Sequence, residues 1–200
     1  MTNKLRRLLV SGRKSWDLHA MTLSAVCGAI GFLLMAYAQF PIVPGYSFLR
    51  FDPGEFAMLL AGATAGPKVG LMAVAVKDLL YLFLRAKSPF GPAADFIACG
   101  TFVYTVSLLT RQRKDTAGFV VACAAGTLAR TIVMIPANIV ILRLQFGFGL
   151  SKVVSMIWPV IVPFNVVKSL TNALIAIPLI AALRRTAVVW VKLGRERGGR

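Results

Sequence analysis

The stretch EFAMLLAGATAGPKVGLMAVAVKDLLYLFL, residues 55–84, decides the fold of this chain. A run of about 20 apolar residues crosses roughly 30 Å of hydrocarbon, so this stretch is too long for one transmembrane helix. Gly66 and Pro67 interrupt a helix near its middle, and Lys68 indicates a return to the membrane surface. We therefore predict two spans that are joined at Gly66 and Pro67.

Similar apolar stretches cover residues 18–40, 93–110, 116–142 and 153–183. Of the 200 residues, 58% are hydrophobic and 15% are charged, and the mean hydropathy is +0.75. A soluble domain of this length needs more polar residues to cover its surface. The composition indicates an integral protein of the lipid bilayer.

The distribution of basic residues distinguishes six spans from five, because cytoplasmic connections carry an excess of Lys and Arg. With a split at Gly66, 15 basic residues fall on the side of both termini and five fall on the other side. Without the split, the two sides carry nine and ten. We expect an all-α bundle of six transmembrane helices with both termini cytoplasmic.

The last apolar stretch also needs a boundary. Pro159 and Pro163 disfavour regular helix, so we expect an outer connection over residues 151–163 and a sixth span over 164–184, with a kink at Pro178. The chain then divides into a basic cytoplasmic segment (1–17), a transmembrane substrate-binding domain (18–185) and a basic cytoplasmic tail (186–200).

Motifs of enzymes and ATPases are missing from the sequence. There is no G-x-x-x-x-G-K-[ST] loop, no G-x-S-x-G and no H-E-x-x-H, and His19 is the single histidine. The net charge of +16 gathers at the termini and connections, unlike the one basic face of a nucleic-acid-binding protein. We expect a binding or transport subunit with no catalytic residue, no metal site and no nucleic-acid partner.

Polar side chains converge at the outer ends of several predicted spans. A charged or amide side chain within a span is costly unless it faces a partner or a watery cavity. Asn165, Lys168 and Asn172 share one helix face by their i, i+3, i+7 spacing. The alternative for Lys168 is snorkelling to the lipid headgroups. The convergent residues are Asp52, Glu55, Asp95, Asn138, Asn165 and Lys168.

Three further patterns have structural interpretations. Asp52-Pro53-Gly54-Glu55 resembles a helix capping box, which we favour there over ligand contact. Lys77, Asp78 and Arg130 lie in mid-span, where we expect mutual neutralisation, with Asp78 pairing with Arg130 or Lys77. Ala25 and Ala29 form a small-x-x-x-small pair, which permits close approach of another helix.

Several segments resemble the substrate-binding S components of energy-coupling factor (ECF) transporters, most of all the riboflavin-specific members. Pro163-Phe164-Asn165-Val166-Val167-Lys168 matches a Pro-Phe-Asn-x-x-Lys motif, the most specific piece. The other matching segments are Leu49–Phe56, Ala61–Pro67, Lys77–Leu80 and Gly91–Phe96, and the likeness extends over about residues 20–185.

The resemblance implies a six-helix protein in a prokaryotic cell membrane that binds a vitamin from outside. Such a protein docks on a membrane T protein that carries two cytoplasmic ATPases, and here Ala25 and Ala29 would meet the T protein. Riboflavin or a related flavin would be transported cargo, with no cofactor. Asn138, Asn165 and Lys168 would contact it, and we add Asp95, Gly91 and Phe40 as candidate binding residues; Phe51 and Trp158 are further candidates for stacking.

The sequence departs from the riboflavin pattern at three positions. Pro92 replaces a glutamate, Asp95 replaces an asparagine, and Asp78 replaces another asparagine. Additional carboxylates near a cavity favour a different, more basic ligand. The alternatives are therefore an S component for another vitamin or precursor, a membrane enzyme that acts on lipid through Asp52 and Asp95, and a structural assembly subunit.

Overall fold

The computed structural model describes residues 18–112 and 115–197, with side chains as far as residue 186. The predicted cytoplasmic segment 1–17 and almost all side chains of the predicted tail lie outside the described part. The described helices are α2 (Leu18–Tyr37), α3 (Glu55–Ala65), α4 (Pro67–Leu84), α5 (Phe90–Thr110), α6 (Thr116–Phe146), α7 (Leu150–Met156), the π-helical turn η1 (Ile157–Ile161) and α8 (Val162–Arg197). The short strands β1 (Phe40–Pro41) and β2 (Arg50–Phe51) pair antiparallel.

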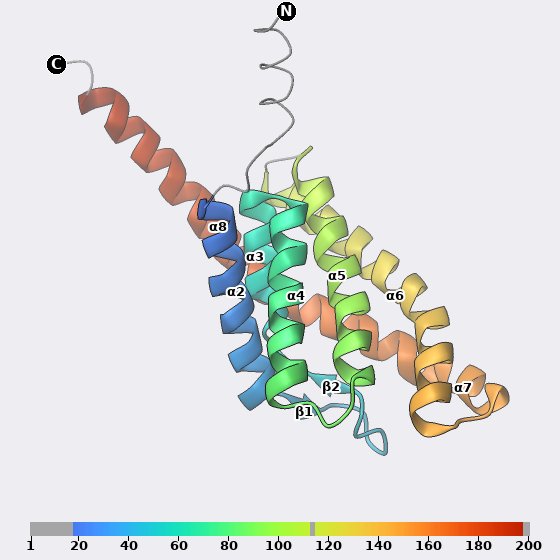
Figure 1. Ribbon diagram of the computed structural model, residues 1–200. Coiled ribbons are helices and arrows are strands. Elements are labelled where there is room, and N and C mark those ends of the chain that lie inside the picture. Colours follow the sequence, from blue (N-terminus) through green and yellow to red (C-terminus); the bar gives the residue numbers. More distant parts are fainter. Residues whose placement is uncertain (1–17, 113–114, 198–200) are drawn as a thin grey trace, which may run out of the picture.

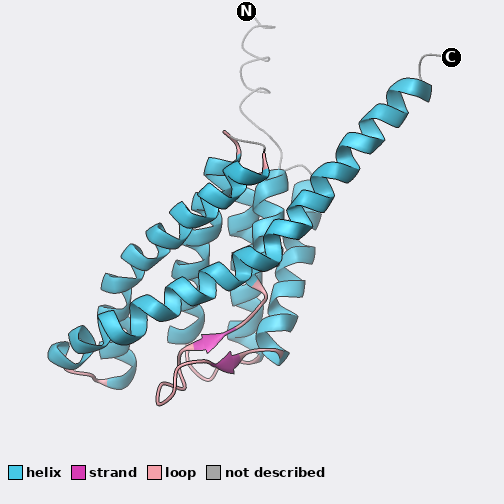
Figure 2. Cartoon of the chain, turned by 180° about the vertical axis from the view of Figure 1, so that it is seen from behind, coloured by secondary structure: helices cyan, strands magenta, loops and turns pink. Residues whose placement is uncertain are grey.

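The helices run alternately between two ends of one bundle (Figures 1 and 2). The start of α2 and the end of α8 lie at one end. The β-hairpin and the connection between α4 and α5 (residues 85–89) lie at the opposite end, which we call the hairpin end. This arrangement is the one expected if the start of the first helix and the end of the last helix face the same side of a membrane.

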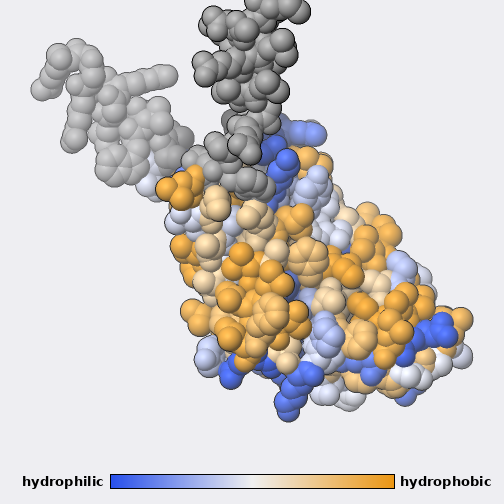
Figure 3. Space-filling view, in the orientation of Figure 1, coloured by the Kyte–Doolittle hydropathy of each residue, from blue (hydrophilic) through white to orange (hydrophobic). Residues whose placement is uncertain are grey.

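Four of the described helical segments are long and apolar enough to cross a membrane: α2, α5, α6 and the continuous segment Leu150–Thr186. Helix α3 has only 11 residues, and α4 contains Lys68, Lys77 and Asp78. Apolar side chains cover much of the flank of the bundle (Figure 3). The helical membrane-type bundle agrees with the sequence analysis, whereas six crossings and cytoplasmic termini stay predictions.

The predicted helix break is present at Gly66, which separates α3 from α4. Gly66 has φ +105°, a backbone conformation that residues with a Cβ rarely adopt. A Cβ at this position would also lie 2.1 Å from the Arg111 guanidinium. Pro67 then starts α4, where its missing N–H costs nothing.

The expected irregular connection over residues 151–163 is wrong, because this segment is helical. Helix α7, η1 and α8 follow one another without a gap. Pro159 lies in the π-helical turn, a local change of hydrogen-bond step that a helix tolerates. Backbone groups in an apolar environment need internal partners, so the chain stays helical despite two prolines. Pro178 lies inside α8 and does not end it.

Two apolar clusters form the core. The larger one joins α3, α4 and α5 with the start of α6 and residues 173–180 of α8. The smaller one lies toward the hairpin end and joins Leu49, Leu142 and Phe164 with α7 and η1. Buried charged residues separate the two clusters along the sequence. This holds in the hairpin–α3 segment, in α6 and in α8.

Candidate functional site

Lys168 lies at the centre of a buried network of charges. Its ammonium group is 2.8 Å from Asp52, 3.0 Å from Glu55 and 2.6 Å from Asp95. It donates a hydrogen bond to Asp95, and its charge is compensated by all three carboxylates. The side chain is 3% exposed. Snorkelling of Lys168 to the headgroups is therefore wrong.

Arg130 connects α6 to the same network. Its Nη1 donates to Glu55 Oε2 at 2.7 Å, and its Nε donates to Asn165 Oδ1 at 3.0 Å. Arg130 thus neutralises Glu55, and the suggested alternative pairing of Arg130 with Asp78 is wrong. The mid-span position expected for Arg130 did not predict its contact with the outer cluster.

The capping-box interpretation of Asp52 and Glu55 is also wrong. Helix α3 begins at Glu55 with Gly54 as its N-cap, and no side chain caps it. The Glu55 side chain is fully buried among Arg130 and Lys168. Asp52 Oδ1 accepts a hydrogen bond from the Gly54 N–H at 3.1 Å, which fixes the turn before the helix.

Lys77 and Asp78 lie at the edge of this network on α4. The Lys77 ammonium donates to Asp95 and lies 3.4 Å from Asp78 Oδ1. Neither carboxylate oxygen of Asp78 has a hydrogen-bond partner, although both are buried. Asp78 and Lys77 therefore form the ion pair that was one of the two expected, but the hydrogen bond of Lys77 goes to α5.

The whole network contains one more carboxylate than cations. Each member is at most 9% exposed. Buried ions are tolerated where partners compensate their lost hydration, and removal of one partner leaves an uncompensated charge. The network therefore fixes α3, α4, α5, α6 and α8 relative to one another. Its members are the carboxylates Asp52, Glu55, Asp78 and Asp95 and the cations Lys77, Arg130 and Lys168.

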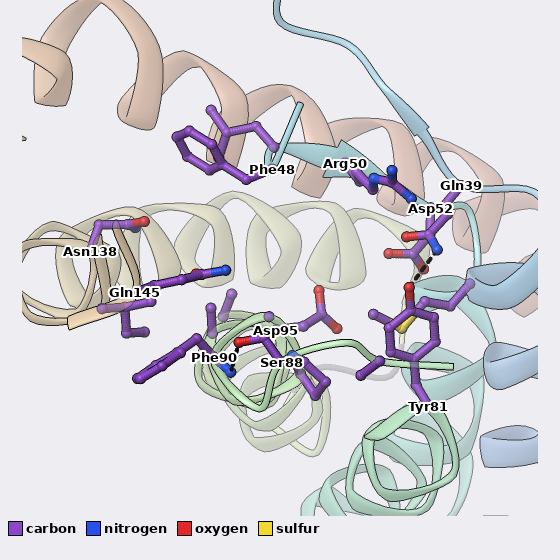
Figure 4. Close-up of a pocket in the computed structure, with 18 of the residues that line it drawn as sticks. Gln39, Phe48, Arg50, Asp52, Tyr81, Ser88, Phe90, Asp95, Asn138 and Gln145 are labelled. Atoms are coloured by element: carbon purple, nitrogen blue, oxygen red, sulfur yellow. Dashed lines mark hydrogen bonds between the residues drawn. The ribbon is translucent and has the colours of Figure 1, made fainter. Parts of the chain in front are cut away.

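A cavity of about 430 Å³ lies above the network toward the hairpin end. Asn138 and Gln145 project into it from α6, Asp95 and Phe90 from α5, and Phe48 from the hairpin loop (Figure 4). Five of the six candidate binding residues line this cavity: Asn138, Asn165, Lys168, Asp95 and Gly91. A Cβ at Gly91 would meet no atom within 4 Å.

Phe40 is the exception among the six candidates, since it is not a lining residue of the cavity. It is 52% exposed, and its ring packs on Phe51 at a centroid distance of 5.5 Å. Trp158 is 75% exposed and also points away. Phe48 and Phe90 supply the aromatic surface instead.

Sequence reasoning missed several lining residues. Gln145 follows Asn138 by seven positions, so it shares that helix face and could have been found by the same periodicity. Gln39 follows α2 and Tyr81 lies on α4, and they meet through a hydrogen bond of 2.6 Å at the cavity wall (Figure 4). That encounter has no counterpart in sequence spacing.

Asn138 has the most freedom to bind a ligand. Its Nδ2 donates to the Met134 carbonyl of its own helix at 2.7 Å, and its Oδ1 has no partner among the described residues. Asn165 is more committed, because it accepts from Arg130 and donates to the Ile161 carbonyl. Asn172 does not line the cavity, and its amide donates to the Asp52 and Lys168 carbonyls.

The model of the family described as "ECF transporter, substrate-specific component" matches residues 19–180. The chain belongs to this family. It is 30% identical over 161 residues to the riboflavin transporter RibU of Staphylococcus aureus, covering 78% of this chain and 85% of the relative. It is 27% identical over 157 residues to the riboflavin transporter FmnP of Bacillus subtilis, covering 73% and 82%.

The fold of this S component is also that of a solved one. A structure described as the S component of a bacterial ECF transporter superposes with a TM-score of 0.72 at 28% sequence identity. The match covers 84% of this chain and 97% of that chain. Family and fold together make this chain a membrane transport component, which is consistent with the expectation of a non-enzyme.

The small residues of α2 in this S component lie on two faces. Ser24, Gly28 and Gly31 are buried against the bundle, and the Ser24 hydroxyl donates to the Val69 carbonyl at 3.1 Å. Ala25 is exposed and Ala29 is half-buried. Ala25 therefore lies on a face of α2 that the described part of the bundle leaves uncovered.

One group of potential metal ligands occurs within the described residues. Ligand atoms of Glu55, Asp95 and Cys99 lie within 4.8 Å of one another. Arg130, Lys168 and Lys77 already contact these carboxylates. A divalent cation there would face three positive side chains, so we assign it no metal.

Proposed function

We propose that this S component captures riboflavin or a closely related flavin from the external side of the cell membrane. It would deliver the flavin together with a membrane T protein and two cytoplasmic ATPases. The observation that carries the proposal is the cavity of about 430 Å³ into which Asn138, Asn165, Lys168 and Asp95 converge. The relatives named as riboflavin transporters support the same ligand class.

The chemistry of the cavity suits a planar heterocycle. Its volume is within the ~300–1,000 Å³ of typical small-molecule sites. The polar edge of a flavin ring combines carbonyl acceptors with one N–H donor. Asn138 offers both a free acceptor and a second N–H, whereas Asp95 only accepts. Phe48 and Phe90 provide apolar surface for the ring faces.

A ligand that reaches Lys168 has to compete with the contacts that its ammonium group already makes. The Lys168 ammonium already lies within 3.0 Å of three carboxylates and donates a hydrogen bond to Asp95. A flavin carbonyl would therefore replace one of these contacts rather than fill an empty position. We infer that Asn138 makes the first polar contact and that Lys168 chiefly holds the floor of the cavity in shape.

The departures Pro92 and Asp95 support a second candidate, an S component for another vitamin or precursor. Both residues line the cavity, and Asp95 makes that part of the wall acceptor-only. A ligand with more N–H donors than a flavin would match it better. The lipid-enzyme alternative has less support, because Asp52 and Asp95 are both bound to lysine side chains.

The direct test is the ligand of the purified protein. We expect yellow protein with flavin absorbance, and an extract of the denatured protein that contains flavin. Ligand-free protein should bind riboflavin in a fluorescence-quenching titration and ignore other vitamins in a thermal-shift panel. A colourless preparation that is stabilised by a different vitamin would replace riboflavin with the second candidate.

Asn138→Ala tests the proposed contact. Loss of a buried hydrogen bond of about 1–1.5 kcal/mol weakens binding roughly tenfold. The unfolding temperature should not change, because the existing bond of Asn138 stays within its own helix. Thr131→Ala is the matched control, since Thr131 is on the same helix and bonds the Thr127 carbonyl away from the cavity. Equal riboflavin affinity in both variants would argue against this site.

A further inference from the structure

The side chain of Asn165 is held on both sides by groups of fixed polarity. Its Oδ1 accepts a hydrogen bond from Arg130 Nε at 3.0 Å, and its Nδ2 donates to the Ile161 carbonyl at 2.9 Å. A guanidinium group can only donate and a carbonyl group can only accept. Because Asn165 is 2% exposed, the opposite orientation of its amide would leave buried polar atoms unpaired. The amide therefore has one favoured orientation.

Arg130 is held in turn by Glu55. Its Nη1 donates to Glu55 Oε2 at 2.7 Å, while its Nε donates to Asn165. Both charged side chains are at most 1% exposed. A guanidinium group is a rigid planar fork, so a contact at one of its nitrogens restricts the directions of the other two. Glu55 therefore holds Arg130 in place, and Arg130 orients the Asn165 amide.

Charge compensation alone does not explain this use of an arginine. A lysine at position 130 would also neutralise Glu55, but it is a point charge on a flexible stem. It would not supply a second nitrogen at a fixed distance and angle for Asn165. The contact of Arg130 with Asn165 joins α6 to α8 across 35 positions of sequence, and both residues line the cavity. The second donor of Arg130 is thus directed at a candidate binding residue.

This orientation decides what Asn165 can offer to a ligand. Its Oδ1 already faces a cation, whereas the second N–H of its Nδ2 is used by neither of the two hydrogen bonds. Asn138 supplies the acceptor that Asn165 lacks, because its Oδ1 has no partner among the described residues. The two amides therefore differ in their free polarity, and together they can bind a ligand edge that combines an acceptor with an N–H donor.

We propose that Arg130, anchored by Glu55, is a positioning residue that fixes Asn165 as a hydrogen-bond donor to the ligand. This inference rests on the proposed function, because it takes the ligand to lie in the cavity beside Asn165. Arg130 acts on the ligand through Asn165, so loss of its guanidinium weakens binding only while the Asn165 amide is present. The hydrogen bonds of the described residues do not join Arg130 to Asn138, so these two side chains should act independently.

A double-mutant cycle on the full chain in nanodiscs tests this role, with riboflavin affinity measured by fluorescence quenching. We expect Arg130→Lys to weaken binding about fivefold and Asn165→Ala about tenfold. The double variant should bind about tenfold more weakly than the unchanged protein, because the effect of Arg130 disappears with the amide. Asn138→Ala provides the control background, in which Arg130→Lys should keep its full effect. Thermal unfolding of each variant shows that the bundle is folded.

Two results would overturn the positioning role of Arg130. One is a loss of affinity from Arg130→Lys that persists in the Asn165→Ala background, which assigns Arg130 to direct contact or to the fold. The other is unchanged binding by Arg130→Lys, because lysine keeps the charge without the fork.

Two further results keep the test decisive. If Arg130→Lys does not fold, Glu55→Gln takes its place in the cycle, since it releases the guanidinium and removes one carboxylate from a network that has an excess. Its effect should likewise disappear with the Asn165 amide, and an effect that persists overturns the role. If the unchanged protein does not bind riboflavin, the proposed flavin ligand is contradicted, and the same cycle is measured with the vitamin that stabilises the protein.

Discussion

At the scale of single residues, the unusual feature is the concentration of charge inside an apolar bundle. Lys168 contacts three carboxylates, and Arg130 and Lys77 each bind one of the same acids. Because each ion has several partners, removal of one partner affects the others. The network therefore behaves as a unit, and the effects of its substitutions should not be additive.

Asp78 is the member whose removal we expect to be tolerated. Its two oxygens are buried without a hydrogen-bond partner, and the network has an excess carboxylate. Asp78→Asn should keep or raise the unfolding temperature of the ligand-free protein, by about 1 kcal/mol of stability at most. Riboflavin binding should not change, because Asp78 does not line the cavity.

Asp95→Asn is the matched comparison for that substitution. It removes the charge that both Lys77 and Lys168 contact, so we expect a loss of about 3 kcal/mol in stability. Differential scanning fluorimetry in detergent measures both variants. A larger loss for Asp78→Asn than for Asp95→Asn would reverse our assignment of the two carboxylates.

At the scale of elements, α2 shows how one helix serves two surfaces. Gly28 packs so closely on α4 that a Cβ there would lie 2.7 Å from Val76 Cβ and 2.8 Å from the Ala73 carbonyl oxygen. The exposed Ala25 lies on another face. The first face holds the bundle together, and the second is the one that we propose for the T protein.

Leucine at these two positions separates the roles. Gly28→Leu forces α2 away from α4 and should destabilise the protein by about 1–3 kcal/mol. Ala25→Leu should change stability by less than about 0.5 kcal/mol, as exposed substitutions do. Under the proposed function it should still weaken co-purification with the T protein and ATPases while riboflavin binding stays intact. Normal assembly of Ala25→Leu with those partners would place the docking face elsewhere.

The break at Gly66 and the continuity at Pro159 show how differently local sequence determines elements. Gly66 combines a positive φ with a proline that follows it, so local chemistry ends α3 there. Pro159 and Pro163 looked equally disruptive. The η1 residues Val160 and Ile161 pack in the smaller apolar cluster, and the chain stays helical at both prolines. Tertiary contacts thus override the proline preference in one case only.

At the scale of the whole molecule, the alternating helices give a testable topology. The first described helix begins and the last one ends at the same end of the bundle, and the cavity lies toward the other end (Figure 1). We expect reporter fusions at both termini to report the cytoplasm, and a cysteine introduced at Ser88 to react with an impermeant reagent from outside. Bound riboflavin should slow that reaction, since Ser88 lines the cavity. Fusions that report opposite sides would contradict the six-span prediction.

The sequence alone determined that the chain is a helical membrane protein, and it identified five of the residues that line the cavity. Apolar stretches and the charge bias need only one-dimensional counting, because a bilayer has a fixed thickness and basic residues favour one side of it. The Pro-Phe-Asn-x-x-Lys segment and the depth of Asn138 led to the same cavity wall that the structure has. Those properties depend on position along the chain.

Tertiary structure decided which charges are partners. Glu55 meets Arg130 across 75 positions of sequence, and Lys168 meets Asp95 across 73. Spacing rules relate residues along one helix, so they gave Glu55 a capping role. Equal depth in the membrane gave Arg130 the wrong alternative partner. The aromatic wall was decided in the same way, because the hairpin turns Phe48 toward the cavity and Phe40 away. Pairings of this kind depend on how whole helices pack, and no local pattern records that.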